Sequence, residues 1–175
     1  MTAAARIFVV EGTFGILDAG EIPIETADLS QGLLVAMEQG ALVLTGINTG
    51  GVQVRVRVLD EAPLPEAGSW EETARGRICA PEGQLRVESL THGPDHHLPL
   101  LSAGGPGRYE VEVKARGRGL APDGCHARSG EHYLITAWPS PDRSPFPDRP
   151  PRVGDEEDPR AADRRQRLLR GGGPT

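Results

Sequence analysis

The chain has 175 residues with 23 glycines, 16 prolines and a formal net charge of −6. This length allows one domain of ordinary size plus a further segment, and many glycines, prolines and short apolar runs are typical of an all-β rather than a helical architecture. The acidic balance argues against direct binding of nucleic acid, because acidic surfaces repel phosphate backbones, and it favours a basic partner.

The first strand is expected at residues 6–10, and residues 13–17 are expected to continue it after a break at Gly12. Residues 18–20 are typical of a turn, since aspartate can bond its own backbone and glycine accepts a positive φ. Residues 21–30 contain a proline and several acidic residues, which indicates an extended edge or a loop.

A β-hairpin is predicted next, from residues 32–38 and 41–47, with Gly40 at the turn. A helix over residues 29–38 is the alternative, because a short apolar run does not separate helix from strand by its period. Residues 48–51 read Asn-Thr-Gly-Gly, which is a strong turn signal.

The clearest strand covers residues 51–60. Four valines alternate there with polar residues, at Val52, Val54, Val56 and Val58. Successive side chains of a strand face opposite ways, so these valines should share one face and pack under a second apolar layer.

Further strands are expected, separated by loops rich in glycine or proline, at residues 70–79, 84–90, 108–116 and 132–138. Eight or nine short strands at close spacing are the signature of a sandwich or barrel. We therefore predict an all-β fold, an antiparallel β-sandwich that occupies residues 1–138.

After residue 138 the composition changes to dense charge and many prolines. Residues 139–175 lack the apolar surface that would offset ordering entropy, so we predict a disordered C-terminal tail. A short partner-bound helix over residues 161–170 is the alternative. No apolar run is long enough to span a membrane and the N-terminal run is too short for a signal peptide, which predicts a cytoplasmic location.

The cysteines and histidines are the candidate metal ligands. Two cysteines are too few for a disulfide framework, and buried thiols are expected at Cys79 and Cys125. Two loops could meet in a zinc site through Cys125 and the histidines His92, His96, His97 and His126. Exposed loop histidines are the other interpretation, and paired Cys-x-x-Cys spacing is absent, so we assign no metal and no cofactor.

Candidate catalytic groups are few. Glu110 and Glu112 project from one face of a strand, near the spacing of paired glycosidase acids. Basic residues share that face, and Arg86 and Glu88 are expected across from it, so an exposed sheet face of mixed charge explains the pattern. GxSxG, HExxH and GxxxxGK[ST] motifs are absent from the sequence, and no catalytic residue is assigned.

Four aromatic residues lie on or beside predicted strands: Trp70, Tyr109, Tyr133 and Trp138. They could form a platform on which a sugar stacks, but we expect them to pack inside the sandwich.

Two loops, residues 21–28 and 60–72, carry most of the acidic excess. In the second loop the candidate partner-binding residues are Glu61, Glu66, Glu71 and Glu72. Their reversal to lysine is expected to weaken binding of a basic partner and to leave folding unchanged. A solubilising surface without a partner is the alternative.

Several strand patterns in this order resemble one family. They are Gly-Ala-Leu-Val-Leu at residues 40–44, the strand at 51–59, Trp70, Gly-x-Leu-x-Val-Glu-Ser-Leu at 83–90 and Gly-Arg-Tyr-x-Val-x-Val at 107–113. Over residues 30–138 the chain resembles the ComJ type of small β-sandwich, competence-locus proteins that inhibit a partner DNA-entry nuclease. It departs from that type in its N-terminal hairpin, its loop at 117–130 and its tail.

The resemblance implies an acidic, non-enzymatic sandwich that binds a protein partner, such as a basic nuclease or toxin, and it supplies no catalytic residues. This is the leading interpretation. The alternative is a sandwich that binds a small molecule or carbohydrate through Trp70, Trp138 or the loop histidines, and an enzyme ranks last.

Overall fold

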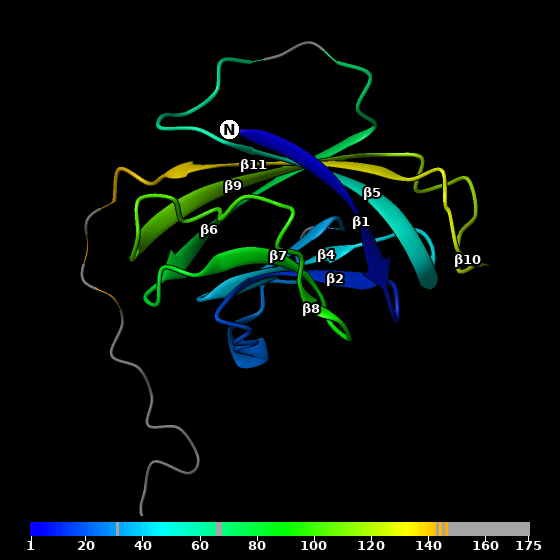
Figure 1. The fold of residues 1–175 in the computed structure, drawn as a ribbon, viewed down its shortest axis with the longest axis horizontal. Helices are drawn as coiled ribbons and strands as arrows, with labels where there is room; N and C mark the ends of the chain where they lie inside the picture. Colours follow the sequence, from blue (N-terminus) through cyan, green and yellow to red (C-terminus); the bar gives the residue numbers. More distant parts are fainter. Residues whose placement is uncertain (31, 66–67, 143, 145, 147–175) are drawn as a thin grey trace, which may run out of the picture. The chain divides into compact units, whose positions relative to one another are not determined.

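The computed structural model describes residues 1–30, 32–65, 68–142, 144 and 146. Within these residues two β-sheets face each other as the layers of a sandwich (Figure 1). The large sheet has the order β1 (Thr2–Val9), β5 (Thr49–Val58), β11 (His132–Pro139), β9 (Gly107–Arg116) and β6 (Glu72–Ala80), with β10 (Cys125–His126) beside β5. The small sheet has the order β3 (Leu34–Met37), β4 (Gly40–Leu44), β2 (Thr13–Asp18), β7 (Leu85–Ser89) and β8 (Gly93–Pro94).

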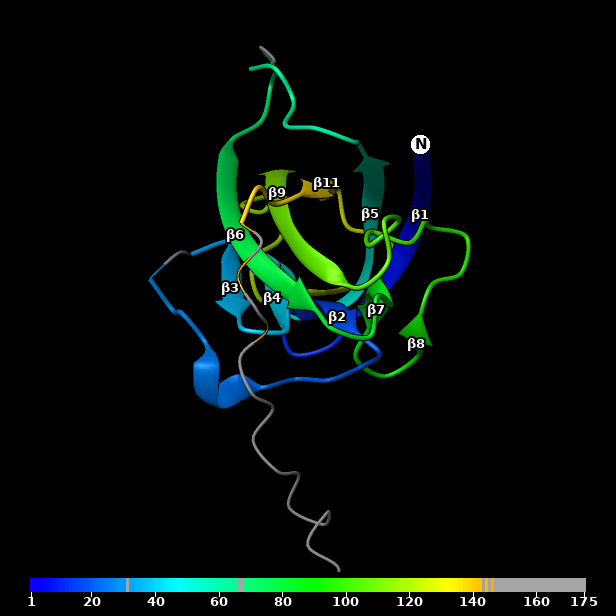
Figure 2. The same ribbon diagram turned by 90° about the vertical axis from the view of Figure 1, so that its left-hand side faces the viewer.

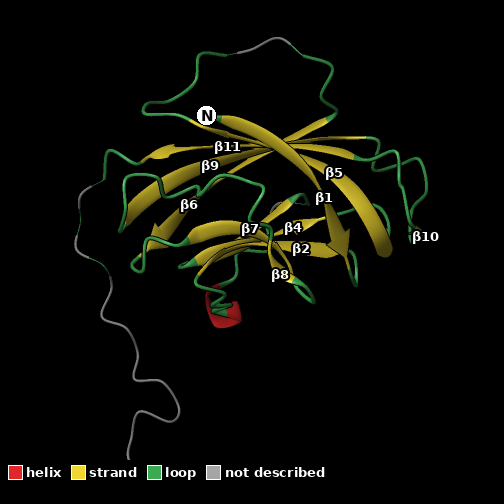
Figure 3. Cartoon of the chain, in the orientation of Figure 1, coloured by secondary structure: helices red, strands yellow, loops and turns green. Residues whose placement is uncertain are grey.

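The all-β sandwich expected from the sequence is confirmed (Figure 3). Two short pairings, β8 and β10, lie inside segments that were expected to be loops, because two residues are too few to show a period. Most neighbouring strands are antiparallel, but β11 and β10 both run parallel to β5. Parallel neighbours need a long connection, and here the five strands from β6 to β10 separate β5 from β11 in the chain.

The valines of β5 form the floor of the core, as the alternation predicts. Val52, Val54 and Val56 are fully buried, whereas Arg55 between them is exposed on the other face. Across the sandwich, Phe14 of β2 meets Tyr133 of β11 edge to face, with ring centroids 5.4 Å apart. β9 contributes the predicted inward residues Tyr109, Val111, Val113 and Ala115.

The hairpin of β3 and β4 is confirmed, with Gly40 in their closing register pair with Met37, so the helix alternative over residues 29–38 is wrong. The expectation that residues 13–17 continue the first strand is also wrong. Glu11 and Gly12 take positive φ values of 52° and 69°, which turns the chain from the large sheet into the small one. One hydrogen bond, from Gly12 N–H to the Asn48 carbonyl at 2.8 Å, fixes this turn.

The Asn-Thr-Gly-Gly motif does not form the expected turn, because β5 already begins at Thr49. Its glycines serve close backbone approach instead. A Cβ on Gly50 would lie 1.7 Å from the carbonyl oxygen of His126 on β10, so only glycine permits this parallel contact.

Both cysteines are free thiols, and only Cys79 is buried as expected. Cys125 is exposed because the short edge pairing of β10 leaves it outside the core. Of the four aromatic residues, Tyr109 and Tyr133 lie in the core, Trp138 is buried on the outer face under Arg75, and Trp70 is only partly buried.

The compact unit runs from Met1 to Ser144, six residues beyond the boundary expected from composition. Ser140 is buried; its N–H donates to the Arg108 carbonyl and its hydroxyl donates to Glu110. Asp142 pairs with Arg77 of β6 at 3.1 Å. The tail that was predicted to be disordered lies almost entirely outside the described residues. Beyond Ser144 only Phe146 is described, and it is exposed. Among the described residues, no helix has the length and apolar character to cross a membrane.

Candidate functional site

The two acidic loops lie on opposite sides of the sandwich. The strap, residues 59–65 and 68–71, lies between β5 and β6 in the chain and passes on the outer side of the large sheet (Figures 1 and 2). The acidic segment, residues 21–30, contains the 3-10 helix η1 (Ile24–Thr26) and lies on the outer side of the small sheet. The two loops therefore form two separate surfaces.

The structure divides the four glutamates that the sequence singled out. Glu61 is exposed, and Glu66 lies outside the described residues. Glu71 accepts a hydrogen bond from the Gly117 N–H at 2.9 Å. Glu72 forms an ion pair with Arg118, which also donates to the Gly32 carbonyl at 3.1 Å. Two of the four carboxylates thus hold the loop after β9, a role that local sequence does not reveal.

The acidic segment combines charge with exposed apolar side chains. Ile22, Ile24 and Leu29 are 43%, 57% and 77% exposed. Backbone bonds fix the segment to β3, because the Asp28 N–H donates to the Ala36 carbonyl and the Glu38 N–H donates to the Thr26 hydroxyl. The segment therefore presents a defined surface of glutamate, aspartate and apolar side chains.

The Asp28 carboxylate accepts a hydrogen bond from the Ser30 N–H at 2.9 Å. Side-chain and backbone hydrogen bonds from Ser30 lower the pKa of Asp28 below its usual value. Asp28 therefore contributes negative charge to the acidic segment at neutral pH.

The outer face of the large sheet is rich in cations. The exposed and partly exposed lysine and arginine side chains on its strands are Arg6, Arg55, Arg57, Arg75, Arg77, Arg108, Lys114 and Arg116. Cross-strand pairing was expected here, but its partners were placed wrongly. Arg75 and Arg77 of β6 lie across from Glu112 and Glu110, at 2.6 and 2.9 Å, while Arg86 and Glu88 belong to the other sheet.

Glu112 is buried rather than exposed, because Arg75 and Lys114 both reach its carboxylate. Burial raises the pKa of Glu112, but the hydrogen bonds and charges of those two cations outweigh it, so that the pKa lies below its usual value. An ionised and neutralised carboxylate of this kind suits a structural role. Glu110 and Glu112 therefore give no support to a paired acid and base.

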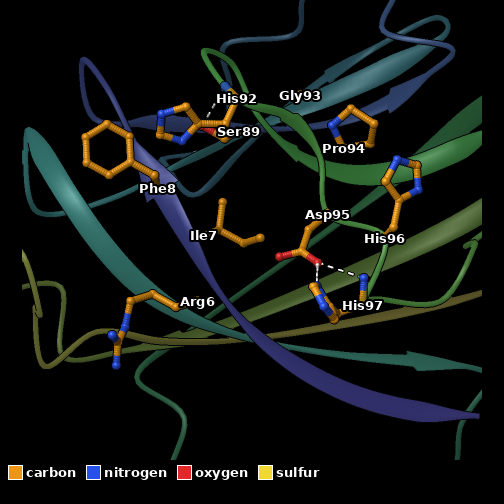
Figure 4. Close-up of a pocket in the computed structure, with 10 residues that line it drawn as sticks. All are labelled: Arg6, Ile7, Phe8, Ser89, His92, Gly93, Pro94, Asp95, His96 and His97. Atoms are coloured by element: carbon orange, nitrogen blue, oxygen red, sulfur yellow. Dashed lines mark hydrogen bonds and ion pairs between the residues drawn. The ribbon is translucent and has the colours of Figure 1, made fainter.

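The loop histidines do not converge. A cavity of about 320 Å³ between β1 and the loop around β8 is lined by His92, His96 and His97, among others. Figure 4 shows their imidazoles spread around its rim. The His92 ring packs 5.0 Å from that of Phe8, and His97 pairs with Asp95 at 3.1 Å. Within the described residues, no group of three His, Cys, Asp or Glu side chains is placed to hold a metal ion.

Two fully buried carboxylates, which the sequence patterns did not reveal, hold loops in place. Glu131 accepts hydrogen bonds from the N–H groups of Gly46 and Ile47, at 3.0 and 2.7 Å. Asp18 accepts from those of Glu82 and Gln84, at 2.7 and 2.6 Å. Each of these two carboxylates binds backbone N–H groups of a loop that is distant in the sequence, so only the tertiary structure identifies its partners.

A second cavity, the under-strap pocket, lies between the strap and the large sheet and measures about 380 Å³. It is lined by Ala4, Gln53, Val54, Arg55, Gly68, Ser69, Trp70, Arg116, His132 and Tyr133. Of these, the sequence patterns had singled out only Trp70 and Tyr133 as candidates for binding a ligand. The basic residues alternate along strands that become neighbours only in the folded sheet, and so local sequence gave no signal.

Comparisons with known proteins place the fold. No protein-family model and no curated protein matches the chain. Among solved structures, the crystal structure of ComJ, inhibitor of the DNA degrading activity of NucA, from Bacillus subtilis, superposes with a TM-score of 0.50 at 13% sequence identity, covering 79% of this chain and 96% of that chain. Crocagin biosynthetic gene J superposes with a TM-score of 0.47 at 16% identity, covering 80% and 99%. The expected resemblance to ComJ is thus confirmed at the level of the fold.

Proposed function

We propose that this chain is a non-enzymatic protein-binding module that inhibits a basic partner, and that the acidic segment is its binding surface. The observation that carries the proposal is the combination of exposed apolar side chains, Ile22, Ile24 and Leu29, with the carboxylates around them. Protein interfaces combine an apolar centre with a polar rim, and charge complementarity at the rim sets partner choice and association rate.

The stretch of chain that contains the acidic segment carries charge of one sign. No lysine or arginine occurs between Arg6 and Arg55, whereas that stretch contains six acidic residues, Glu11, Asp18, Glu21, Glu25, Asp28 and Glu38. A nuclease holds DNA through basic groups, so a nuclease is a natural partner class for such a surface. The likeness in fold to ComJ, an inhibitor of the DNA-degrading activity of NucA, supports the same class of function.

The strap is the competing surface. Glu61 is exposed there, Leu64 is 85% exposed, and Glu66 stays a sequence prediction. The strap lies over the cationic face of the large sheet, which lowers the net negative potential that a basic partner would meet. We therefore place the binding surface on the acidic segment.

The test compares two matched double variants of the full chain as affinity baits in lysate of the source organism. Glu25→Lys/Leu29→Ser alters the acidic segment, and Glu61→Lys/Leu64→Ser makes the same chemical changes on the strap. We expect the wild type and the strap variant to recover a basic protein in a salt-sensitive manner, and the acidic-segment variant to recover at least tenfold less. The purified partner should be an enzyme that the wild-type chain inhibits in a direct activity assay.

Loss of recovery with the strap variant alone would move the binding surface to the strap. If neither variant changes the recovery of the partner, binding occurs at neither the acidic segment nor the strap, and the proposal is wrong. Circular dichroism of each variant checks that its sheet content equals that of the wild type.

A further inference from the structure

The under-strap pocket is built from one row of outward side chains on neighbouring strands. Gln53 of β5 pairs in register with His132 of β11, which pairs with Arg116 of β9. Arg55 stands one outward position further along β5 and lies across from Ala4 of β1. Because Ala4 presents only a methyl group, the sheet surface beside Arg55 is left open.

Arg55 and Arg116 line the same pocket from the strands on either side of β11. Strands β5 and β9 are separated by one strand, so their backbones lie about 10 Å apart, a gap that two arginine side chains can close. Gln53 and His132 between them offer further donors. Hydrogen-bond donors therefore surround the floor of the pocket.

The strap fixes one of these arginines. The guanidinium of Arg116 lies 5.4 Å from the ring centroid of Trp70 and donates to the Ser69 hydroxyl at 3.3 Å. A cation–π contact and a bond to a neutral hydroxyl orient the group without neutralising its charge. The indole also gives the pocket a flat apolar wall.

The arginines of this pocket differ from the basic residues of β6 and from Lys114 in their partners. Arg75, Arg77 and Lys114 each pair with a carboxylate of the large sheet or of the segment after it. In the part of the chain that the structure describes, no carboxylate lines the pocket and none pairs with Arg55 or Arg116. Among the described residues, two arginines of this acidic protein thus lie beside one cavity without acidic partners.

We propose that the under-strap pocket binds a small organic anion, with its carboxylate or phosphate between Arg55 and Arg116 and its flat remainder against Trp70. Guanidinium groups bind planar carboxylates and phosphates through paired hydrogen bonds. A volume of about 380 Å³ falls within the size range of small-molecule sites. This site lies on the face opposite the acidic segment, so the inference does not rest on the proposed function.

Isothermal titration calorimetry of the full chain tests the site with four probes: inorganic phosphate, citrate, adenosine monophosphate and uncharged adenosine. We expect adenosine monophosphate or citrate to bind, and adenosine not to bind. If adenosine monophosphate binds more strongly than inorganic phosphate and citrate, the preferred ligand carries a phosphate and a flat ring. If citrate binds more strongly than adenosine monophosphate, the preferred ligand is a polycarboxylate.

Arg55→Ala and Arg116→Ala should each weaken the binding of the preferred anion at least tenfold. Trp70→Ala should lower the affinity for adenosine monophosphate more than the affinity for inorganic phosphate. Arg86→Ala removes the same charge from the other sheet and should leave binding unchanged. Three results would overturn the proposal: no binding of any anion at millimolar concentration, equal losses in Arg86→Ala and Arg55→Ala, or affinity for oligonucleotides that rises with their length and survives both pocket variants.

Discussion

The hydroxyl of Tyr133 donates a hydrogen bond to Oε2 of Glu131 over 2.5 Å, and both side chains are almost completely buried. Burial, and then this bond to a carboxylate, raise the pKa of Tyr133 far above its usual value. Since Glu131 also binds the N–H groups of Gly46 and Ile47, it joins the start of β11 to the loop before β5. The loop before the valine strand is thus fixed by a residue more than 80 positions away.

Removal of this carboxylate should be among the most damaging single changes in the domain. Glu131→Ala leaves the buried N–H of Ile47, the partly buried N–H of Gly46 and the buried hydroxyl of Tyr133 without their acceptor, which should cost about 3 kcal/mol or more. Tyr133→Phe removes one of the three bonds and should cost about 1–2 kcal/mol. Urea unfolding of both variants measures the difference, and equal costs would contradict the role given to Glu131.

Polar substitution should destabilise the domain strongly on the inward face of β5 and hardly at all on its outward face. Val56→Asp places an unpaired charge in the core and should cost several kcal/mol, enough to unfold much of the population. Arg55→Gln, at the neighbouring outward position, should change stability by less than about 0.5 kcal/mol. The urea midpoints of the two variants test the assignment of faces, which a well-folded Val56→Asp variant would refute.

Glu88 and Glu112 should contribute to the free energy of unfolding with opposite dependences on pH. Burial raises the pKa of Glu88, so its contribution is fully present below the unfolded value of about 4.3 and is lost as pH rises through the folded value. Glu88→Gln should therefore match the wild type near pH 3.5 and be more stable than it at pH 7.

Glu112 has the contrasting shift. Its folded pKa lies below the unfolded value, because Arg75 and Lys114 together outweigh burial, so its contribution is present above about 4.3 and is lost as pH falls through the folded value. Glu112→Gln should be less stable than the wild type at pH 7 and converge on it in acid. Thermal melts from pH 3.5 to 7 compare both variants, and parallel curves would disprove the two assignments.

Charge reversal among the acidic residues of positions 60–72 should not be neutral for folding at every position. Glu72→Lys replaces the ion pair with Arg118 by two like charges and should cost about 1 kcal/mol. Glu61→Lys lies on an exposed stretch of the strap and should cost less than about 0.5 kcal/mol. Chemical unfolding of the two variants checks this revision of the expectation that reversal leaves folding unchanged, and equal midpoints would restore that expectation.

Truncation should show where the folded unit ends. A chain that stops at Pro139 loses the hydrogen bonds of Ser140 and the Arg77–Asp142 pair, so it should lose about 2 kcal/mol and melt several degrees lower. A chain that stops at Phe146 keeps these contacts and should melt with the full-length protein. Differential scanning calorimetry of the three lengths provides the test, and a normal melt at Pro139 would show that residues 140–144 contribute nothing.

The sequence by itself determined most of the longer strands and which of their faces point into the core. Strict alternation in residues 52–58 and 108–116 predicts the inward valines and Tyr109, because a period of two is a local property of the strand. Gly40 likewise predicted the hairpin of β3 and β4, since turn geometry is set by adjacent residues.

Only the tertiary structure decided which strands become neighbours and which charges meet. The parallel pairing of β5 with β11 joins segments about 80 residues apart, and a period of two is the same for every possible partner strand. For that reason local sequence predicted neither the pairing of Glu112 with Arg75 nor the meeting of Arg55 with Arg116 at one pocket. Local sequence also does not say on which side of the sandwich each acidic loop lies, and the crossing of the chain between layers puts them on opposite sides.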